Sequence, residues 1–146
     1  RLQWGWRTRF WNFGLVADLG PRTRFVSQAM TGSTIMSLVP PGATEHWVHT
    51  RFRSAFGLLS QQVGKGALSG RLEWFDTKEH GSRMTAADES EEGWAATAAL
   101  RWPLWKHFTG FLEVLHVDST RAARLRAGDP AKEVQTVLQA ALRLRW

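Results

Sequence analysis

The sequence predicts an all-β chain that folds as an antiparallel up-and-down meander of about seven strands. Three observations indicate this. Apolar and polar residues alternate in several segments, and the connectors between these segments alternate between short and long. The sequence also has no run of about 18 apolar residues, the length that a membrane-spanning helix needs. With 146 residues, of which 43% are hydrophobic, the chain is in the range of a globular or barrel domain.

The expected strands follow in chain order. Five segments alternate between an apolar and a polar set of residues, as a strand with two different faces does: Leu2–Phe10, Val48–Gln61, Leu68–Thr77, Trp94–Trp102 and Val134–Trp146. We take the five to alternate in the same sense, and we expect Pro103 to end the fourth. Two further segments, Thr23–Ser37 and Phe108–Asp118, have the composition of strands, but their faces are not assigned.

The connectors alternate in length along the chain. The short ones are Ala17–Arg22, Val63–Ala67 and Pro103–His107, and the longer ones are Val39–His46, Lys78–Glu92 and Ser119–Lys132. In a meander, short turns then lie at one edge together with the C-terminus, and long loops lie at the other. Outer-membrane β-barrels have this arrangement, with turns on the periplasmic side and loops outside. Ten residues at a rise of roughly 3.3 Å, tilted by about 40°, span roughly 25 Å, the height of the apolar band of such a barrel.

The aromatic residues favour the same interpretation. The chain has nine Trp and eight Phe but no Tyr, and Trp is enriched at the boundaries of membranes. We expect an interface belt of Trp4, Trp6, Trp74 and Trp94 towards the long loops and of Trp102 towards the short turns. In this phasing Trp11 and Trp47 fall on the polar set of their strands.

If the apolar faces contact lipid, the polar faces line a pore. The predicted pore-lining residues are mostly basic: Arg7, Arg9, Arg51, Arg53, Arg71, Glu73, Arg101, Gln135, Gln139, Arg143 and Arg145. A net charge of +6 and a wall of guanidinium groups would concentrate small anions. The alternative is that these arginines are hydrated and paired with carboxylates such as Glu73 and Glu113, which leaves a pore without marked preference.

The last strand carries a further signal. Val134–Trp146, with its alternating apolar residues and terminal aromatic, resembles the C-terminal strand signal that the barrel assembly machinery reads; the usual last residue is Phe rather than Trp. The resemblance assigns the signal to Leu142, Leu144 and Trp146.

Other segments resemble the closing strands of Gram-negative porin-like proteins, including the phosphate-selective type. They are RLEWFD at 71–76, EGWAATA at 92–98, EVLHVDS at 113–119 and LRLRW at 142–146, and the resemblance covers the chain from about Gln28 onward. The resemblance implies a porin in the cell outer membrane that passes small anionic or polar solutes and contacts membrane lipid and lipopolysaccharide. It is also compatible with a homotrimer. Seven strands are too few for a water-filled pore and odd in number, so we expect residues 1–146 to be the C-terminal portion of one barrel domain whose N-terminal strands are missing.

The rival interpretation is a soluble β-barrel domain that binds a small ligand or single-stranded nucleic acid. Because Trp and Arg mostly take opposite faces, we expect no nucleic acid partner. We also expect no enzyme activity and no cofactor: the chain has no Cys, and three polar groupings are weak candidates for chemistry. These are a metal site at Glu45, His46 and His49, a hydrolase site at His116, Asp118 and Ser119, and a divalent cation site at Asp88, Glu89, Glu91 and Glu92.

Overall fold

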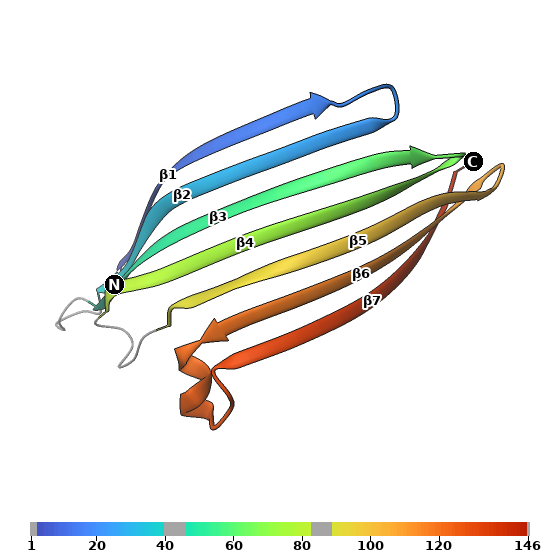
Figure 1. The fold of residues 1–146 in the computed structure, drawn as a ribbon. Coiled ribbons are helices and arrows are strands. Elements are labelled where there is room, and N and C mark those ends of the chain that lie inside the picture. Colours follow the sequence, from blue (N-terminus) through green and yellow to red (C-terminus); the bar gives the residue numbers. More distant parts are fainter. Residues whose placement is uncertain (1–2, 40–45, 83–88, 146) are drawn as a thin grey trace.

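The structure is a computed structural model that describes residues 3–39, 46–82 and 89–145 (Figure 1). It contains one seven-stranded sheet in which the strands follow one another in chain order and each is antiparallel to its neighbours. The predicted all-β meander is thus confirmed, as an open sheet. The strands are β1 (Gln3–Asp18), β2 (Thr23–Val39), β3 (His46–Val63), β4 (Gly66–Ser82), β5 (Glu91–Trp105), β6 (Phe108–Arg121) and β7 (Lys132–Leu144).

Several strands are longer than the alternation predicted. β1 continues past Phe10 to Asp18, and β5 continues through Pro103 to Trp105. The expectation that Pro103 ends its strand is therefore wrong. The register of β5 against β6 shifts between Pro103 and Trp105, so that Leu104 is the extra residue of a bulge. Proline is tolerated beside such a bulge because the ladder of hydrogen bonds is already interrupted there.

The strand ends joined by short turns and the strand ends joined by longer connectors lie at opposite ends of the sheet, as expected (Figure 1). The turn between β3 and β4 has only two residues, Gly64 and Lys65, and Gly64 has φ 58°. Glycine at the first position of a two-residue hairpin turn supplies this left-handed conformation without strain. At the same edge the C-terminal segment joins the β5–β6 turn, because the backbone N–H of Arg145 donates to the carbonyl of His107 at 2.9 Å.

The connector between β6 and β7 is not an irregular loop throughout. It begins with a 3-10 helix, η1 (Ala122–Ala127), which ends at Gly128 with φ 86°. Neither η1 nor any other helix in the described ranges has the length and apolar character needed to cross a bilayer.

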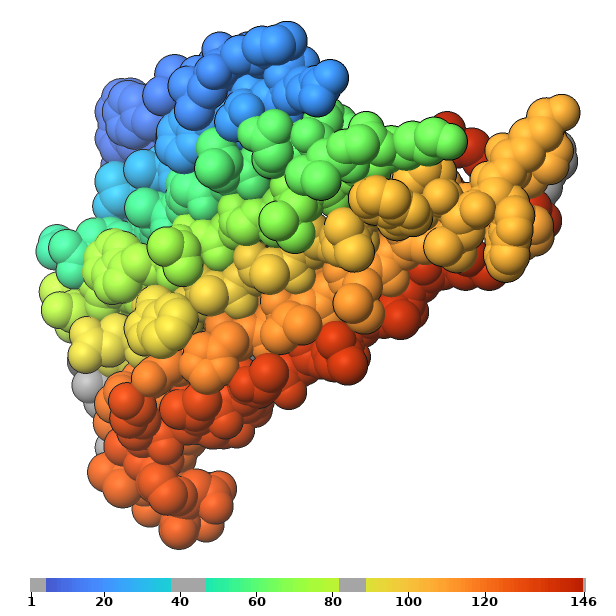
Figure 2. All heavy atoms as spheres, turned by 45° about the vertical axis from the view of Figure 1, so that its right-hand side comes forward, coloured from blue at the N-terminus to red at the C-terminus, as the bar shows by residue number. Residues whose placement is uncertain are grey.

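The described residues form a single layer without a hydrophobic core. Figure 2 shows the strands side by side, from β1 in blue to β7 in red. Ala67, at 7% exposed, is the only buried hydrophobic residue in the described part of the chain, and large apolar side chains such as Leu72 (67%) and Leu138 (69%) are exposed.

The register gives the sheet two faces. We call them the Leu72 face and the Arg71 face, after two neighbours on β4. The Leu72 face comprises odd-numbered residues of β1 to β3 and even-numbered residues of β4 to β7, as far as the register shifts at His80 and Leu104, because directly opposed residues of antiparallel strands point to the same side. Along β3 and β4 the Leu72 face is mostly exposed while the Arg71 face is mostly half-buried. Side chains crowd on the inside of a curved sheet, so the Arg71 face is the concave one.

Candidate functional site

The Leu72 face carries a mostly apolar band across all seven strands. The band covers the part of the sheet towards the short turns. Its apolar members are Trp11, Phe13, Leu15, Ala17, Phe25, Ala29, Ala55, Leu59, Leu68, Leu72, Trp74, Trp94, Ala96, Ala98, Leu100, Trp102, Leu112, Val114, Val134, Leu138, Ala140, Leu142 and Leu144. Within the same limits the face also has the polar residues Thr23, Ser27, Gln61, His116 and Thr136 and the glycines Gly57, Gly70 and Gly110.

Tryptophans lie at both limits of this band. Trp74 and Trp94 are directly opposed on β4 and β5 at the limit nearer the long connectors. Trp102 lies eight residues along β5, near the short turns, and the Leu104 bulge brings Trp105 to the same face, where its ring meets Phe108 edge-on at 5.8 Å. Eight residue steps of roughly 3.3 Å, tilted by about 40°, separate the two limits by roughly 20 Å.

The predicted belt is only partly on this face. Trp74, Trp94 and Trp102 lie on it, but Trp6 lies on the Arg71 face, opposite Met36, and its indole N–H donates to Thr8 at 2.8 Å. Placing Trp6 in the same belt as Trp74 was therefore wrong. The backbone of Trp4 belongs to β1, and its side chain lies outside the described residues. Trp11, which the sequence phasing put on the polar side, is instead on the Leu72 face and 73% exposed.

The Arg71 face is mixed: polar side chains lie on every strand, among apolar ones such as Phe52, Phe75 and Leu115. Arg71 donates to Glu73 at 2.7 Å, and its guanidinium lies 4.2 Å from the ring centre of Phe56 on β3. Hydroxyl and amide side chains pair across neighbouring strands on this face, and Gln28 donates to Asn12 at 2.9 Å. The polar members in the middle of the sheet include Thr8, Asn12, Gln28, Thr34, Ser54, Ser60, Ser69, Arg71, Glu73, Thr97, Arg101, Glu113, Gln135, Gln139 and Arg143.

The structure therefore brings together six of the predicted pore-lining residues. They are Arg71, Glu73, Arg101, Gln135, Gln139 and Arg143. Arg145 follows β7 directly. Arg101 and Arg143 have no ion pair within the described ranges, and Arg143 lies 5.5 Å from the ring centre of Phe111. This region near the short turns is consequently the most positive part of the face.

The other four predicted residues lie on the opposite side of the sheet. The register puts Arg7, Arg9, Arg51 and Arg53 on the Leu72 face, so the expectation that all the arginines share one face is wrong for these four.

The physical reason is the two-residue turn between β3 and β4. It pairs Val63 with Gly66, and this register aligns odd residues of β3 with even residues of β4. Both sets of β3 contain apolar residues, so alternation within β3 alone could not decide its face. The alternation of β4 shows clearly which of its residues share a face. Counting back from β4 across the two turn residues, Gly64 and Lys65, was the signal that could have assigned the faces of β3.

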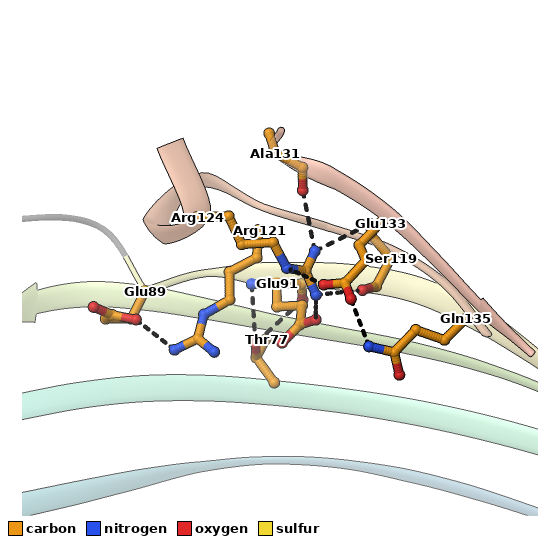
Figure 3. Close-up of polar contacts among 9 residues, drawn as sticks. All are labelled: Thr77, Glu89, Glu91, Ser119, Arg121, Arg124, Ala131, Glu133 and Gln135. Carbon is orange, nitrogen blue, oxygen red and sulfur yellow. Dashed lines mark hydrogen bonds and ion pairs between the residues drawn. The ribbon is translucent and has the colours of Figure 1, made fainter. Parts of the chain in front are cut away.

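An arginine cluster ties the β6–β7 connector to the long-connector edge (Figure 3). Arg124 contacts Glu91 and Glu133 at 3.0 Å each. It also donates to the Ser119 hydroxyl at 2.8 Å and to two backbone carbonyls, those of Ser119 and Ala131. One guanidinium thus joins β5, β6 and β7, a function that sequence patterns did not reveal.

A second pair of arginines holds Glu89, just before β5. Arg121 donates to one oxygen of Glu89 at 2.5 Å and Arg126 donates to the other at 2.6 Å. The Arg121 hydrogen bond, followed by that of Arg126, lowers the pKa of the Glu89 carboxyl below its usual 4.5.

The three weak candidates for chemistry do not assemble in the described residues. Ser119 lies on the Arg71 face whereas His116 and Asp118 lie on the Leu72 face, and the His116 ring contacts Thr136 at 2.9 Å. In the acidic group, Glu89 and Glu91 are paired with arginines, and Asp88 is outside the described residues. No group of three metal-type side chains occurs in the described ranges; Glu45 and the His46 side chain are outside them.

Comparison with known proteins adds no relative: no family model, no curated protein and no solved structure matches the chain.

Proposed function

We propose that this chain forms part of the wall of a transmembrane β-barrel, with the Leu72 face against lipid and the Arg71 face towards an aqueous channel. The observation that carries the proposal is an exposed, mostly apolar band, limited by tryptophans, with charged and polar side chains behind it on the opposite face of a sheet whose described residues form no core. Such a band cannot remain in water, because exposed contiguous apolar surface of this extent is unfavourable.

Lipid fits this band better than a second protein layer. The indole ring combines an apolar body with one N–H donor, and it is stabilised where hydrocarbon meets headgroups and water. Trp residues at the two limits of a band are a feature of the aromatic girdles of membrane barrels. If a second protein layer covered the band, Trp would not be favoured at the two limits of the band over other apolar residues.

The channel would pass small hydrophilic solutes by diffusion and favour anions. Arg101 and Arg143 carry the preference, since neither is neutralised by a described carboxylate and both lie near the short turns. Deeper in the channel, Arg71 is balanced by Glu73. Charge on a pore wall acts over about 8 Å at physiological salt, so Arg101 and Arg143 act together on a passing ion.

The test is the reversal potential of the full-length protein in planar bilayers under a KCl gradient. Wild type is expected to prefer chloride. Arg101→Glu and Arg143→Glu are expected to shift the preference towards potassium singly and to reverse it together. Arg7→Glu, on the Leu72 face, is the matched control and should leave selectivity unchanged. Absence of conductance would refute the channel, and a preference that Arg101 and Arg143 do not alter would refute their role.

A further inference from the structure

The four arginines that the register moves to the Leu72 face lie beyond the apolar band, towards the long connectors. Arg53 shares a ladder row with Trp11 through Thr31 on β2, and Arg51 shares the next row with Arg9 through Ser33. Lys78 lies directly opposite Arg51 on β4. Three strands thus bring four cations to one surface region.

The short side chains of β2 leave a hollow among these cations. Thr31 and Ser33 form its floor, with Arg9 on one side and Arg51 and Arg53 on the other, and its volume is about 960 Å³. Hollows of this size accommodate drug-sized ligands or headgroups.

Charge in the hollow is poorly balanced. Asp76 is its one described carboxylate and is only 3% exposed; it accepts a hydrogen bond from Arg53 Nε at 2.9 Å. Arg9, Arg51 and Lys78 have no ion pair in the described part of the chain and are exposed. Glu92, beside Asp76 on β5, is outside the lining. The hollow therefore carries an excess of three positive charges for an anion to neutralise.

Its position indicates what kind of anion. Arg53 lies 5.6 Å from the ring centre of Trp74, which limits the apolar band. A ligand in the hollow therefore has its anionic part among the cations and any hydrocarbon part on the band. A free anion would use only the first of these surfaces, whereas an amphiphile with a phosphate headgroup would use both.

We propose that this basic hollow binds the phosphate groups of lipopolysaccharide, with its acyl chains along the apolar band. This inference rests on the proposed function, in which the Leu72 face contacts lipid, and on the expectation from the sequence that the long connectors face outside. Arginine suits the task because its planar fork of N–H donors binds phosphate through two hydrogen bonds. Arg53, held by Asp76, gives the site one preoriented member.

The experiment measures retention of lipopolysaccharide by the folded full-length protein in detergent, using native mass spectrometry. Wild type should retain lipopolysaccharide more strongly than its dephosphorylated form. Because each basic residue at a membrane surface contributes about fivefold in affinity, Arg51→Gln with Lys78→Gln should weaken retention by about twenty-five-fold. Arg101→Gln with Arg143→Gln removes the same charge from the Arg71 face and should change retention by less than about twofold.

Two further measurements keep the outcomes distinct. Arg9→Gln alone, on another strand, should weaken retention by about fivefold even if the double variant folds poorly. Inorganic phosphate should not displace the lipid at equal concentration; equal displacement would mean a free-anion site and overturn the proposal. Equal losses for the two double variants would overturn it as well. If the wild type inserts and conducts but does not distinguish the two lipid forms, this inference alone fails; without insertion, the proposed function fails with it.

Discussion

Replacement of Arg124 with Ala should loosen the β6–β7 connector more than any other single change in η1. The side chain of Arg124 is 20% exposed and makes five polar contacts, two of them with carboxylates. Each partly exposed ion pair contributes about 0.5–1 kcal/mol. Each bond to a hydroxyl or carbonyl contributes about 0.5–1 kcal/mol net of water. Because all five come from one guanidinium, we take the lower part of the total, about 3 kcal/mol.

A local cost of about 3 kcal/mol corresponds to an opening equilibrium about a hundredfold larger. Hydrogen exchange of the amides of residues 121–132, measured on the full-length protein in vesicles, should accelerate by that factor in Arg124→Ala. The matched control is Arg126→Ala, since Arg126 is 45% exposed and Glu89 is its one ion-pair partner among the described residues. It should accelerate exchange by about twofold. Equal effects of the two changes would show that the five contacts of Arg124 do not hold the connector.

Three further predictions follow from other sites. Gly32→Ala should destabilise the sheet by about 1–3 kcal/mol in urea unfolding, because a Cβ there would overlap the carbonyl of Arg9; Gly70→Ala, with nothing within 4 Å of its Cβ, is the neutral control. A folded carboxyl with a lowered pKa stabilises above its unfolded value, so the contacts of Glu89 should hold above pH 4.5 and be lost as the pH falls further. Acid-active protease should then cleave residues 122–131 more readily, and Glu89→Gln should remove the pH step. Deleting Trp146 from the full-length protein should impair outer-membrane insertion, and normal heat-modifiable migration in membranes would contradict the assembly signal.

The sequence predicted the number, order and direction of the strands because alternation and connector length report them directly. It also predicted the faces of β4, β5 and β7, where one set of residues is clearly apolar. It failed on β3 because Phe52 and Phe56 on one face compete with Leu59 on the other. It failed on β1 for the same reason, and register then decided the faces of both.

The same difference between strands with and without clear alternation decided which residues of the candidate site could be placed from the sequence. Arg101 and Arg143, on strands with clear alternation, share the face of Arg71 as expected, whereas Arg51 and Arg53 do not. The role of Arg124 could not be predicted, because its partners come from three strands and meet only through the fold of the connector. Side chains in loops have no period from which a face can be read.

The bulge at Leu104 in β5 and the two-residue turn between β3 and β4 tolerate changes of chain length differently. At Leu104 an additional residue is accommodated as a bulge, and the pairs of β5 with β6 from Glu91 to Pro103 keep one register. Between Val63 and Gly66 there is no such bulge. One inserted residue there would shift β3 by one position and carry Leu59 to the other face. Related chains should therefore vary in length at Leu104 and keep the two residues of the β3–β4 turn.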